Sequence, residues 1–260
     1  MTNNNLGEKR IALFIDFDNL ALGMKQSPKQ KFEINLVLDR VLEKGKILVK
    51  KAYADWSRYR DYKTQLHEAA IELIELPKKR MTGKNSGDIR MVVDAMEVGY
   101  SKDHIGTFVL VSGDSDFSPL VSKLRENDKE VIGIGMKSAS SQLLIENCDE
   151  FIYYDDLVRQ TERANEERAS AKLTGKKKEA YDLVRGTVRA LFREGRELVW
   201  ASMVKQTIKR KKPQFDESYL DFASFSELLL EMEKDKFLKL EKDEKSGSLI
   251  VTAVAGRRSK

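Results

Sequence analysis

Two pairs of aspartates stand out as groups that could do chemistry, because each pair has one residue between its members. Asp16 and Asp18 follow one short apolar run, and Asp114 and Asp116 follow another. Carboxylates that converge without basic partners raise each other's pKa, unless a divalent cation relieves the repulsion. Mg²⁺ or Mn²⁺ takes oxygen ligands, activates water and stabilises the departing oxygen of a phosphodiester. The pattern therefore predicts a carboxylate metal site.

A further acidic position precedes a helical pattern in the middle of the chain. Asp88 opens the pattern of Ile89, Val92, Val93 and Met96, and Asp94 lies within it. Six positions on a helix give about 600° of rotation, so the two aspartates do not share a face. We expect Asp88 to reach the site, because a helix start beside a loop is better placed to do so.

The alternative for each aspartate is a purely structural role, as a helix cap or a turn residue. The set as a whole favours a site, because two predicted strand ends each carry an Asp-x-Asp sequence. Asn19 stands beside the first of them and Ser112 beside the second.

The segments that must position these residues alternate between strand and helix patterns. We expect strands at 11–15, 45–53, 107–111, 131–134 and 151–154, with helical patterns at 36–42, 60–71, 89–96, up to 124 and from 140. Such alternation predicts an α/β fold with a mostly parallel sheet and helices on both faces. Catalytic groups collect beyond the carboxyl ends of such strands, where residues about a hundred positions apart can be neighbours.

The chain changes character after this region. The polar stretch Arg159 to Lys178 is predicted to be a charged linker, although its first part could equally be a solvated helix. Beyond it we expect helices at 180–192, 202–208 and 225–232, then strands at 237–240 and 249–251. Three helices followed by a β-hairpin predict a small winged helix-turn-helix domain.

Basic residues concentrate in this second part, although the whole chain carries a net charge of only +5 from 47 basic and 42 acidic residues. One group recurs at spacings of four, four and three, which places it on one helical face, and a second group is contiguous. Such clusters suit phosphates, whereas the alternative is a solvated face. The predicted RNA-binding residues are Arg185, Arg189, Arg193, Arg196, Lys209, Arg210, Lys211 and Lys212.

The composition excludes several classes of protein. Of the 260 residues 41% are hydrophobic and 34% charged, which is typical of a globular protein and not of collagen, a disordered chain or a membrane bundle. No apolar run approaches the roughly 20 residues that span a bilayer, and the first residues lack signal-peptide features. We therefore expect a cytoplasmic protein with no membrane partner. Cys148, His67 and His104 are too few for a zinc site.

The segment from about Lys9 to Asp156 resembles the NYN domain, which has a PIN-like nuclease fold and includes LabA-like proteins. Three motifs carry the resemblance: Ile15-Asp-Phe-Asp-Asn-Leu20, Gly83-Lys-Asn-Ser-Gly-Asp-Ile-Arg-Met-Val-Val-Asp94 and Val111-Ser-Gly-Asp-Ser-Asp-Phe-Ser-Pro-Leu120. It implies a three-layer domain with a parallel sheet and a ribonuclease that depends on Mg²⁺ or Mn²⁺.

Carried over residue by residue, the resemblance gives the chain a set of site residues. Asp16, Asp88, Asp114 and Asp116 match the acidic positions of the family, as catalytic residues and metal ligands. The supporting residues are Asn19 and Ser112 by the same match, Lys84 as a phosphate contact, and Asp18 and Asp94 as neighbouring carboxylates.

Residues from Leu191 to Val251 are similar to the OST-HTH or LOTUS domain. The similarity rests on Val199-Trp-Ala-Ser-Met-Val-Lys205, Lys211-Lys-Pro-Gln-Phe-Asp216, Tyr219 and Phe222-Ala-Ser-Phe-Ser-Glu-Leu-Leu229. It implies a winged helix that binds RNA, single-stranded or structured, with G-rich RNA as one option, or in some members a protein partner. The expected organisation is a nuclease domain at 9–157, a charged linker at 158–178 and a LOTUS domain at 179–253.

The expected function is metal-dependent endoribonucleolytic cleavage of RNA, with the second domain holding the RNA. Two alternatives stay open. One is a catalytically weak RNA-binding regulator, and the other is a structure-specific nuclease that acts on DNA. The sequence also leaves a homodimer open.

Overall fold

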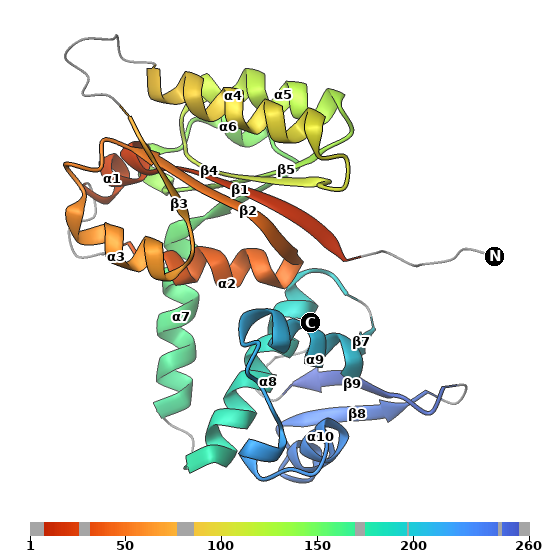
Figure 1. Ribbon diagram of the computed structural model, residues 1–260. Coiled ribbons are helices and arrows are strands. Elements are labelled where there is room, and N and C mark those ends of the chain that lie inside the picture. The colour runs from red at the N-terminus through yellow and green to blue at the C-terminus, as the bar shows by residue number, and fades with distance from the viewer. Residues whose placement is uncertain are drawn as a thin grey trace. The chain divides into compact units, whose positions relative to one another are not determined.

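The computed structural model describes residues 8–25, 32–76, 86–169, 175–196, 198–243 and 246–254. Lys84, the predicted phosphate contact, lies outside these residues. The chain divides into two compact units near residue 162 (Figure 1). The domain limits expected from the sequence stay a prediction, and each unit is described by itself.

A six-stranded parallel sheet forms the centre of the first unit, with the order β3-β2-β1-β4-β5-β6 (Figure 1). Its two central strands, β1 and β4, are almost wholly buried on both faces, which explains why the sequence shows them as short continuous apolar runs. The prediction of an α/β fold with a parallel sheet is confirmed. The strands are β1 (Lys9–Asp16), β2 (Gly45–Ala54), β3 (Glu72–Glu75), β4 (Thr107–Val111), β5 (Glu130–Gly135) and β6 (Glu150–Tyr153).

Helices cover both faces of this sheet, so the first unit has three layers. One face packs against α4 (Ser86–Ser101), α5 (Ser118–Glu126) and α6 (Gln142–Asn147) through a core that includes Phe14 and Phe108. The other face packs against α1 (Phe17–Lys25), α2 (Ile34–Lys44), α3 (Arg60–Glu68) and the start of α7 (Tyr154–Ala169). In Figure 1 the first set lies above the sheet, and α2 and α3 lie below it.

Two elements of the first unit differ from the sequence expectation. Helix α1 begins directly after β1, with no turn residue between them to signal it, so Asp18 lies in the first turn of a helix. Helix α3 ends at Glu68, earlier than expected, because the chain then turns through Ala70, whose φ of 51° is left-handed. The segment that follows is the edge strand β3.

The second unit combines three helices with a three-stranded antiparallel sheet of order β7-β9-β8. Its own apolar core includes Tyr181, Val188, Ile208 and Met232. The winged helix-turn-helix assignment stays a prediction. The elements are α8 (Gly175–Arg193), β7 (Val199–Trp200), α9 (Ala201–Lys211), α10 (Phe225–Lys234), β8 (Leu238–Lys242) and β9 (Leu249–Val254).

The polar stretch after the first sheet is helical as far as it is described. Residues 158–169 continue α7, which corresponds to the solvated-helix alternative for this stretch. Across the part of the chain that the structure describes, none of the helices has the length and the apolar character that crossing a bilayer requires.

Candidate active site

The carboxyl ends of β1 and β4 lie next to each other in the sheet, with Ile15 paired to Val111. Asp16 and Ser112 come at this edge, and Ser112 Oγ donates a hydrogen bond to Asp16 Oδ2 at 2.9 Å. The backbone N–H of Asn19 donates to Asp16 Oδ1 at 3.2 Å. The two strand ends, about a hundred residues apart in the sequence, therefore lie side by side at the carboxyl end of the sheet, and Asp16 lies between them.

Asp16 is a buried carboxyl group, only 8% exposed. Burial raises its pKa to about 7, because the charged form loses hydration. The hydrogen bonds from Asn19 and Ser112 lower this pKa, whereas the negative charges of Asp88 and Asp18 raise it further. Without a cation, the neutral form of Asp16 therefore persists to a much higher pH than in an ordinary aspartate.

The loop after β4 is tied to the loop after β1. Asn19 Oδ1 accepts a hydrogen bond from the backbone N–H of Gly113 at 2.8 Å. On its other side this loop passes close to Ala139. A Cβ atom at Gly113 would lie 2.0 Å from the carbonyl oxygen of Ala139, so only glycine allows this approach. Asn19 thus fixes the position of the loop that carries Asp114 and Asp116.

Within that loop, Asp114 supports the backbone. Its Oδ1 accepts a hydrogen bond from the N–H of Asp116 at 3.0 Å and caps the short 3₁₀ helix η1 (Ser115–Phe117). The N–H of Asp114 in turn donates to Ser112 Oγ at 3.2 Å. Asp114 therefore already uses one carboxylate oxygen for the cap that its sequence pattern also allowed.

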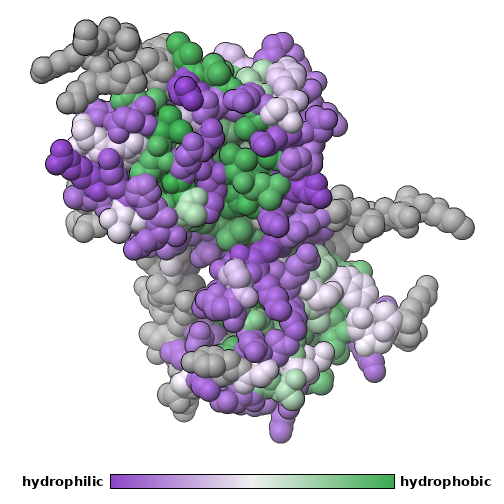
Figure 2. Space-filling view, in the orientation of Figure 1, coloured by the Kyte–Doolittle hydropathy of each residue, from purple (hydrophilic) through white to green (hydrophobic). Residues whose placement is uncertain are grey.

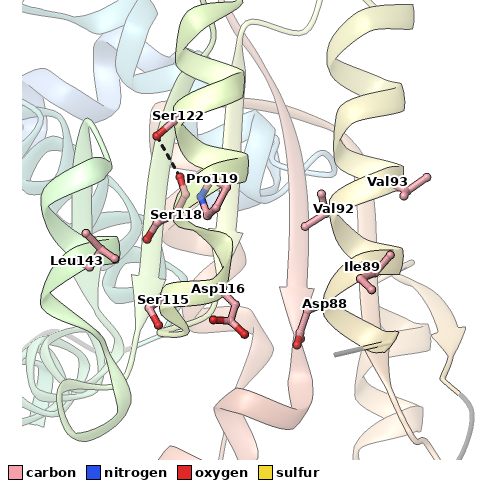
Figure 3. A pocket seen from close by; sticks show the side chains of 10 residues that line it. All are labelled: Asp88, Ile89, Val92, Val93, Ser115, Asp116, Ser118, Pro119, Ser122 and Leu143. Carbon is pink, nitrogen blue, oxygen red and sulfur yellow. Dashed lines mark hydrogen bonds between the residues drawn. The ribbon is translucent and has the colours of Figure 1, made fainter. Parts of the chain in front are cut away.

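Asp88 and Asp116 face a common groove on the first unit. The groove has a volume of about 680 Å³ and lies over the starts of α4 and α5, with α6 beside it (Figure 3). Asp88 comes from the first turn of α4 and Asp116 from η1. The negative charge of Asp88 also raises the pKa of Asp16, so the groove and the buried carboxyl are electrostatically coupled.

Asp18 and Asp94 have partners of their own. Asp18 accepts hydrogen bonds from Tyr59 Oη at 2.7 Å and from the guanidinium of Arg58 at 3.4 Å. It acts on the site through its charge, which contributes to the raised pKa of Asp16.

Asp94 lies deeper, between α4 and β2. Its Oδ2 accepts hydrogen bonds from Tyr53 Oη at 2.8 Å and Lys51 Nζ at 3.1 Å, and its Oδ1 pairs with Arg90 at 3.0 Å. Burial favours a higher pKa for Asp94, but these hydrogen bonds and charges outweigh it and lower the pKa. The chemistry of Asp94 is thus that of a buried ion pair between a helix and the sheet.

Replacing Asp94 with Asn is expected to destabilise the first unit by about 2 kcal/mol, because Lys51 and Arg90 lose their shared counter-ion. Urea denaturation at pH 7 measures this. The loss should stay nearly constant down to about pH 4, because the partners of Asp94 hold the pKa of the folded carboxyl below its usual value of 3.8, and should shrink only at lower pH as this carboxyl becomes protonated. A loss that does not shrink below this range, while the protein is still folded, would contradict an electrostatic origin.

The carboxylate oxygens at this end of the sheet are of the kind that a divalent cation such as Mg²⁺ takes as ligands. No group of three or more His, Cys, Asp and Glu side chains in the described residues is arranged to hold a metal. Mg²⁺ does not need such a cage, since it keeps several waters and binds one or two carboxylates together with substrate phosphates. The buried charge of Asp16, with Asp88 near it, is what such a cation would neutralise. The full set of four aspartate ligands stays a prediction.

The basic residues of the second unit are only partly arranged as expected. Arg185 and Arg189 lie on α8 and Arg193 is its last residue, but Arg196 is beyond the helix. The chain leaves the helix through a turn at Gly195, where φ is 74°, so the expected stripe of four arginines is wrong at its last position. The guanidinium of Arg185 also lies over the ring of Phe237, 5.4 Å from its centre.

The second basic cluster lies at the end of α9. Lys209, Arg210 and Lys211 form the last turn, and Lys212 is the C-cap residue. Cations at this end also stabilise the helix dipole, which gives the cluster a structural reason beside RNA binding. In Figure 2 the visible face of the second unit is mainly hydrophilic.

Sequence reasoning missed the apolar residues around the groove. Ile89 and Val93 belong to the expected helical pattern, yet they are 61% and 54% exposed, because α4 buries Met91, Ala95 and Val98 instead. Figure 2 shows that hydrophobic residues reach the visible surface of the first unit. The sequence does carry a sign of these exposed residues, because α4 contains more apolar residues than a single helical face can bury.

Comparisons with known proteins agree with this fold. Residues 10–155 match the family model described as the NYN domain. The uncharacterized protein MJ0482 of Methanocaldococcus jannaschii is 33% identical over 142 residues, which cover 53% of this chain and 52% of that protein. The chain thus spans about half the length of this curated relative.

A solved structure resembles part of this chain. It is a protein of unknown function, VPA0982, from Vibrio parahaemolyticus RIMD 2210633, with a TM-score of 0.52 and 24% sequence identity. The match covers 60% of this chain and 98% of that one. At this identity the likeness concerns the fold alone.

Proposed function

The chain belongs to the NYN domain family through residues 10–155, and on this basis we propose that it is a metal-dependent endoribonuclease. The observation that carries the proposal is the buried carboxyl of Asp16 at the joined ends of β1 and β4, with its pKa raised to about 7 beside Asp88. A metal-dependent hydrolase of phosphodiesters needs such a concentration of negative charge to hold its divalent cation.

In the proposed mechanism, Asp16 and Asp88 hold the cation, with Asp116 and Asp114 as the further candidate ligands. When bound, the cation supplies an activated water and stabilises the departing oxygen. Ser112 Oγ and the N–H of Asn19 each occupy one oxygen of Asp16, which fixes the orientation of the carboxylate and leaves further lone pairs for binding. Asp116, exposed on η1, is placed to accept a hydrogen bond from a water in the groove.

The test is a cleavage assay with the purified full-length protein. Single-stranded RNA, duplex RNA and flap DNA are incubated with Mg²⁺, with Mn²⁺ or with EDTA. We expect internal cleavage of RNA with one or both metals and none with EDTA. Cleavage of flap DNA alone would favour the alternative of a structure-specific DNA nuclease. A protein that cleaves none of the substrates with either metal contradicts the proposal.

We also propose that the second unit holds the RNA, through the basic residues of α8 and α9. Its support is the concentration of cations at the end of α9, next to the C-cap residue Lys212. The same feature carries the alternative function, an RNA-binding regulator with little catalytic activity. Measuring affinity and cleavage separately distinguishes the two.

The double charge reversal Arg196→Glu with Lys209→Glu is expected to weaken binding of long RNA by about tenfold or more and to flatten its salt dependence, because both side chains are exposed. Cleavage of a very short oligonucleotide should stay within twofold of wild type, since it reaches only the first unit. Filter binding at several salt concentrations measures the effect. The matched control is Lys102→Glu, also exposed. Equal losses for both variants would contradict a specific surface.

A further inference from the structure

The groove beside Asp88 and Asp116 is larger than a metal site requires. It is lined by Asp88, Ile89, Val92, Asp116, Ser118 and Leu143, among others, and its volume of about 680 Å³ is within the range of small-molecule pockets, about 300–1,000 Å³. We refer to it as the α4–α5 groove. Figure 3 shows Val92 on α4 and Leu143 on α6 at opposite sides of the α5 start.

The walls of the α4–α5 groove are apolar and exposed. Ile89, Val93 and Leu143 are each more than half exposed, although all three are large hydrophobic side chains. Leaving such residues in water costs about 25 cal/mol per Å² of apolar surface, so an apolar face that covers them would bind favourably.

One polar group in the groove lacks a partner. Ser118 is only 6% exposed, and its Oγ is buried without a hydrogen bond. The neighbouring Ser122 donates to the backbone oxygen of Ser118 and not to its hydroxyl. A buried hydroxyl of this kind favours a ligand that brings a donor or acceptor to it.

The charges of the groove disfavour a phosphate bound without a cation. Its charged lining residues within the described part of the chain are Asp88 and Asp116, both acidic. An uncharged ligand that is apolar on its faces and polar at its edge fits this lining. A nucleobase has these properties, and single-stranded RNA presents its bases unstacked.

We propose that the α4–α5 groove binds one base of single-stranded RNA, belonging to a nucleotide next to the phosphate that is cleaved. The inference rests on the proposed function, because the groove is lined by Asp88 and Asp116, two of the proposed ligands of the cation. The base covers Val92 and Leu143 with its faces and bonds Ser118 Oγ with its edge. Duplex RNA, whose bases are paired and stacked, does not enter it.

The experiment follows the methyl NMR signals of isoleucine, leucine and valine in the full-length protein, in EDTA so that the RNA stays intact. It compares a short single-stranded oligoribonucleotide with the same backbone lacking bases. We expect the methyl signals of Ile89, Val92 and Leu143 to shift with the RNA and not with the abasic chain. Shifts that are equal for both ligands, or absent while RNA binds, would overturn the proposal, as would a failure to bind RNA at all.

Variants extend the same titration. Leu143→Asp should raise the Kd for the oligonucleotide about tenfold, and Ser118→Ala about threefold. The control Leu22→Asp changes a residue of α1 that is about equally exposed but is not among those that line the groove, and it should leave the Kd within twofold. An equal effect of the control would contradict the proposal.

Two other outcomes have distinct meanings. Methyl shifts that depend on protein concentration without RNA would identify the groove as a contact between copies of the chain, and would overturn base binding. Base-dependent shifts in a protein that cleaves no RNA would overturn the proposed nuclease function and leave the base site supported. Cleavage of RNA together with methyl shifts that do not depend on the bases would support the proposed nuclease function and overturn the base site.

Discussion

Asp16→Asn is expected to reduce metal-dependent RNA cleavage by at least about a hundredfold, the loss typical when a preorganised charge at a reacting centre is removed. The amide keeps the size of the carboxyl and accepts the same hydrogen bond from the N–H of Asn19. What it loses is the negative charge that the proposed cation requires. Single-turnover cleavage of one labelled RNA, at saturating metal, measures the chemical step.

Two controls make this result specific. Asp103→Asn removes a carboxylate that is exposed in the loop between α4 and β4, at the opposite end of the strands, and should leave cleavage unchanged. The Asp16 variant should also be at least as stable as wild type near pH 7, because it removes a buried charge. If its activity stays within a few-fold of wild type, Asp16 is not a ligand of the catalytic metal and the proposed mechanism is wrong.

Much of the first unit could be predicted because its physics is local. The runs Ile11–Ile15 of β1 and Phe108–Val111 of β4 are apolar throughout and fully buried, which is what a strand buried on both faces requires. A carboxylate that directly follows such a run must lie at the carboxyl end of the sheet. The position of Asp16 beside Ser112 follows from that rule together with the strand order.

What could not be predicted depends on contacts between distant segments. Asp94 has its partners on β2, more than forty residues away, and no spacing in the sequence indicates that Tyr53 and Lys51 face it. The exposed position of Ile89 has the same cause. An amphipathic count identifies which residues of a helix are apolar, but the neighbouring helices decide which of them are covered.

The burial of Asp16 also destabilises the folded protein when no cation is bound. Asp16 is hydrogen-bonded by two donors, and its pKa is still raised to about 7, so burial and the neighbouring carboxylates outweigh those bonds. Functional sites often carry such costs, since the same charge that binds the ligand destabilises the protein without it. The stability of the metal-free protein should therefore depend on the protonation of this one group.

In EDTA, the free energy of unfolding of the first unit is expected to fall by about 4 kcal/mol between pH 4 and pH 8 because of Asp16. Its pKa is 3.8 in the unfolded chain and about 7 in the folded one. Between these values the folded state binds a proton that the unfolded state has lost, so stability decreases as the pH rises. Below 3.8 both states are protonated and the effect vanishes. The difference of about three pKa units converts at about 1.4 kcal/mol each.

The measurement is urea denaturation of wild type and Asp16→Asn in parallel, at pH values from 4 to 8. Trp56 is buried in the first unit, and replacing Trp200 of the second unit with Phe makes the tryptophan fluorescence report on the first unit alone. The difference in stability between the two proteins, which cancels the titration of all other groups, should change by about 4 kcal/mol in favour of the variant as the pH rises. Mg²⁺ should stabilise wild type at pH 8 and have little effect on the variant, because a cation that binds only the folded state adds to its stability. Parallel pH profiles for the two proteins would show that the pKa of Asp16 is not raised in the folded chain, and would remove the electrostatic argument for a cation at this end of the sheet.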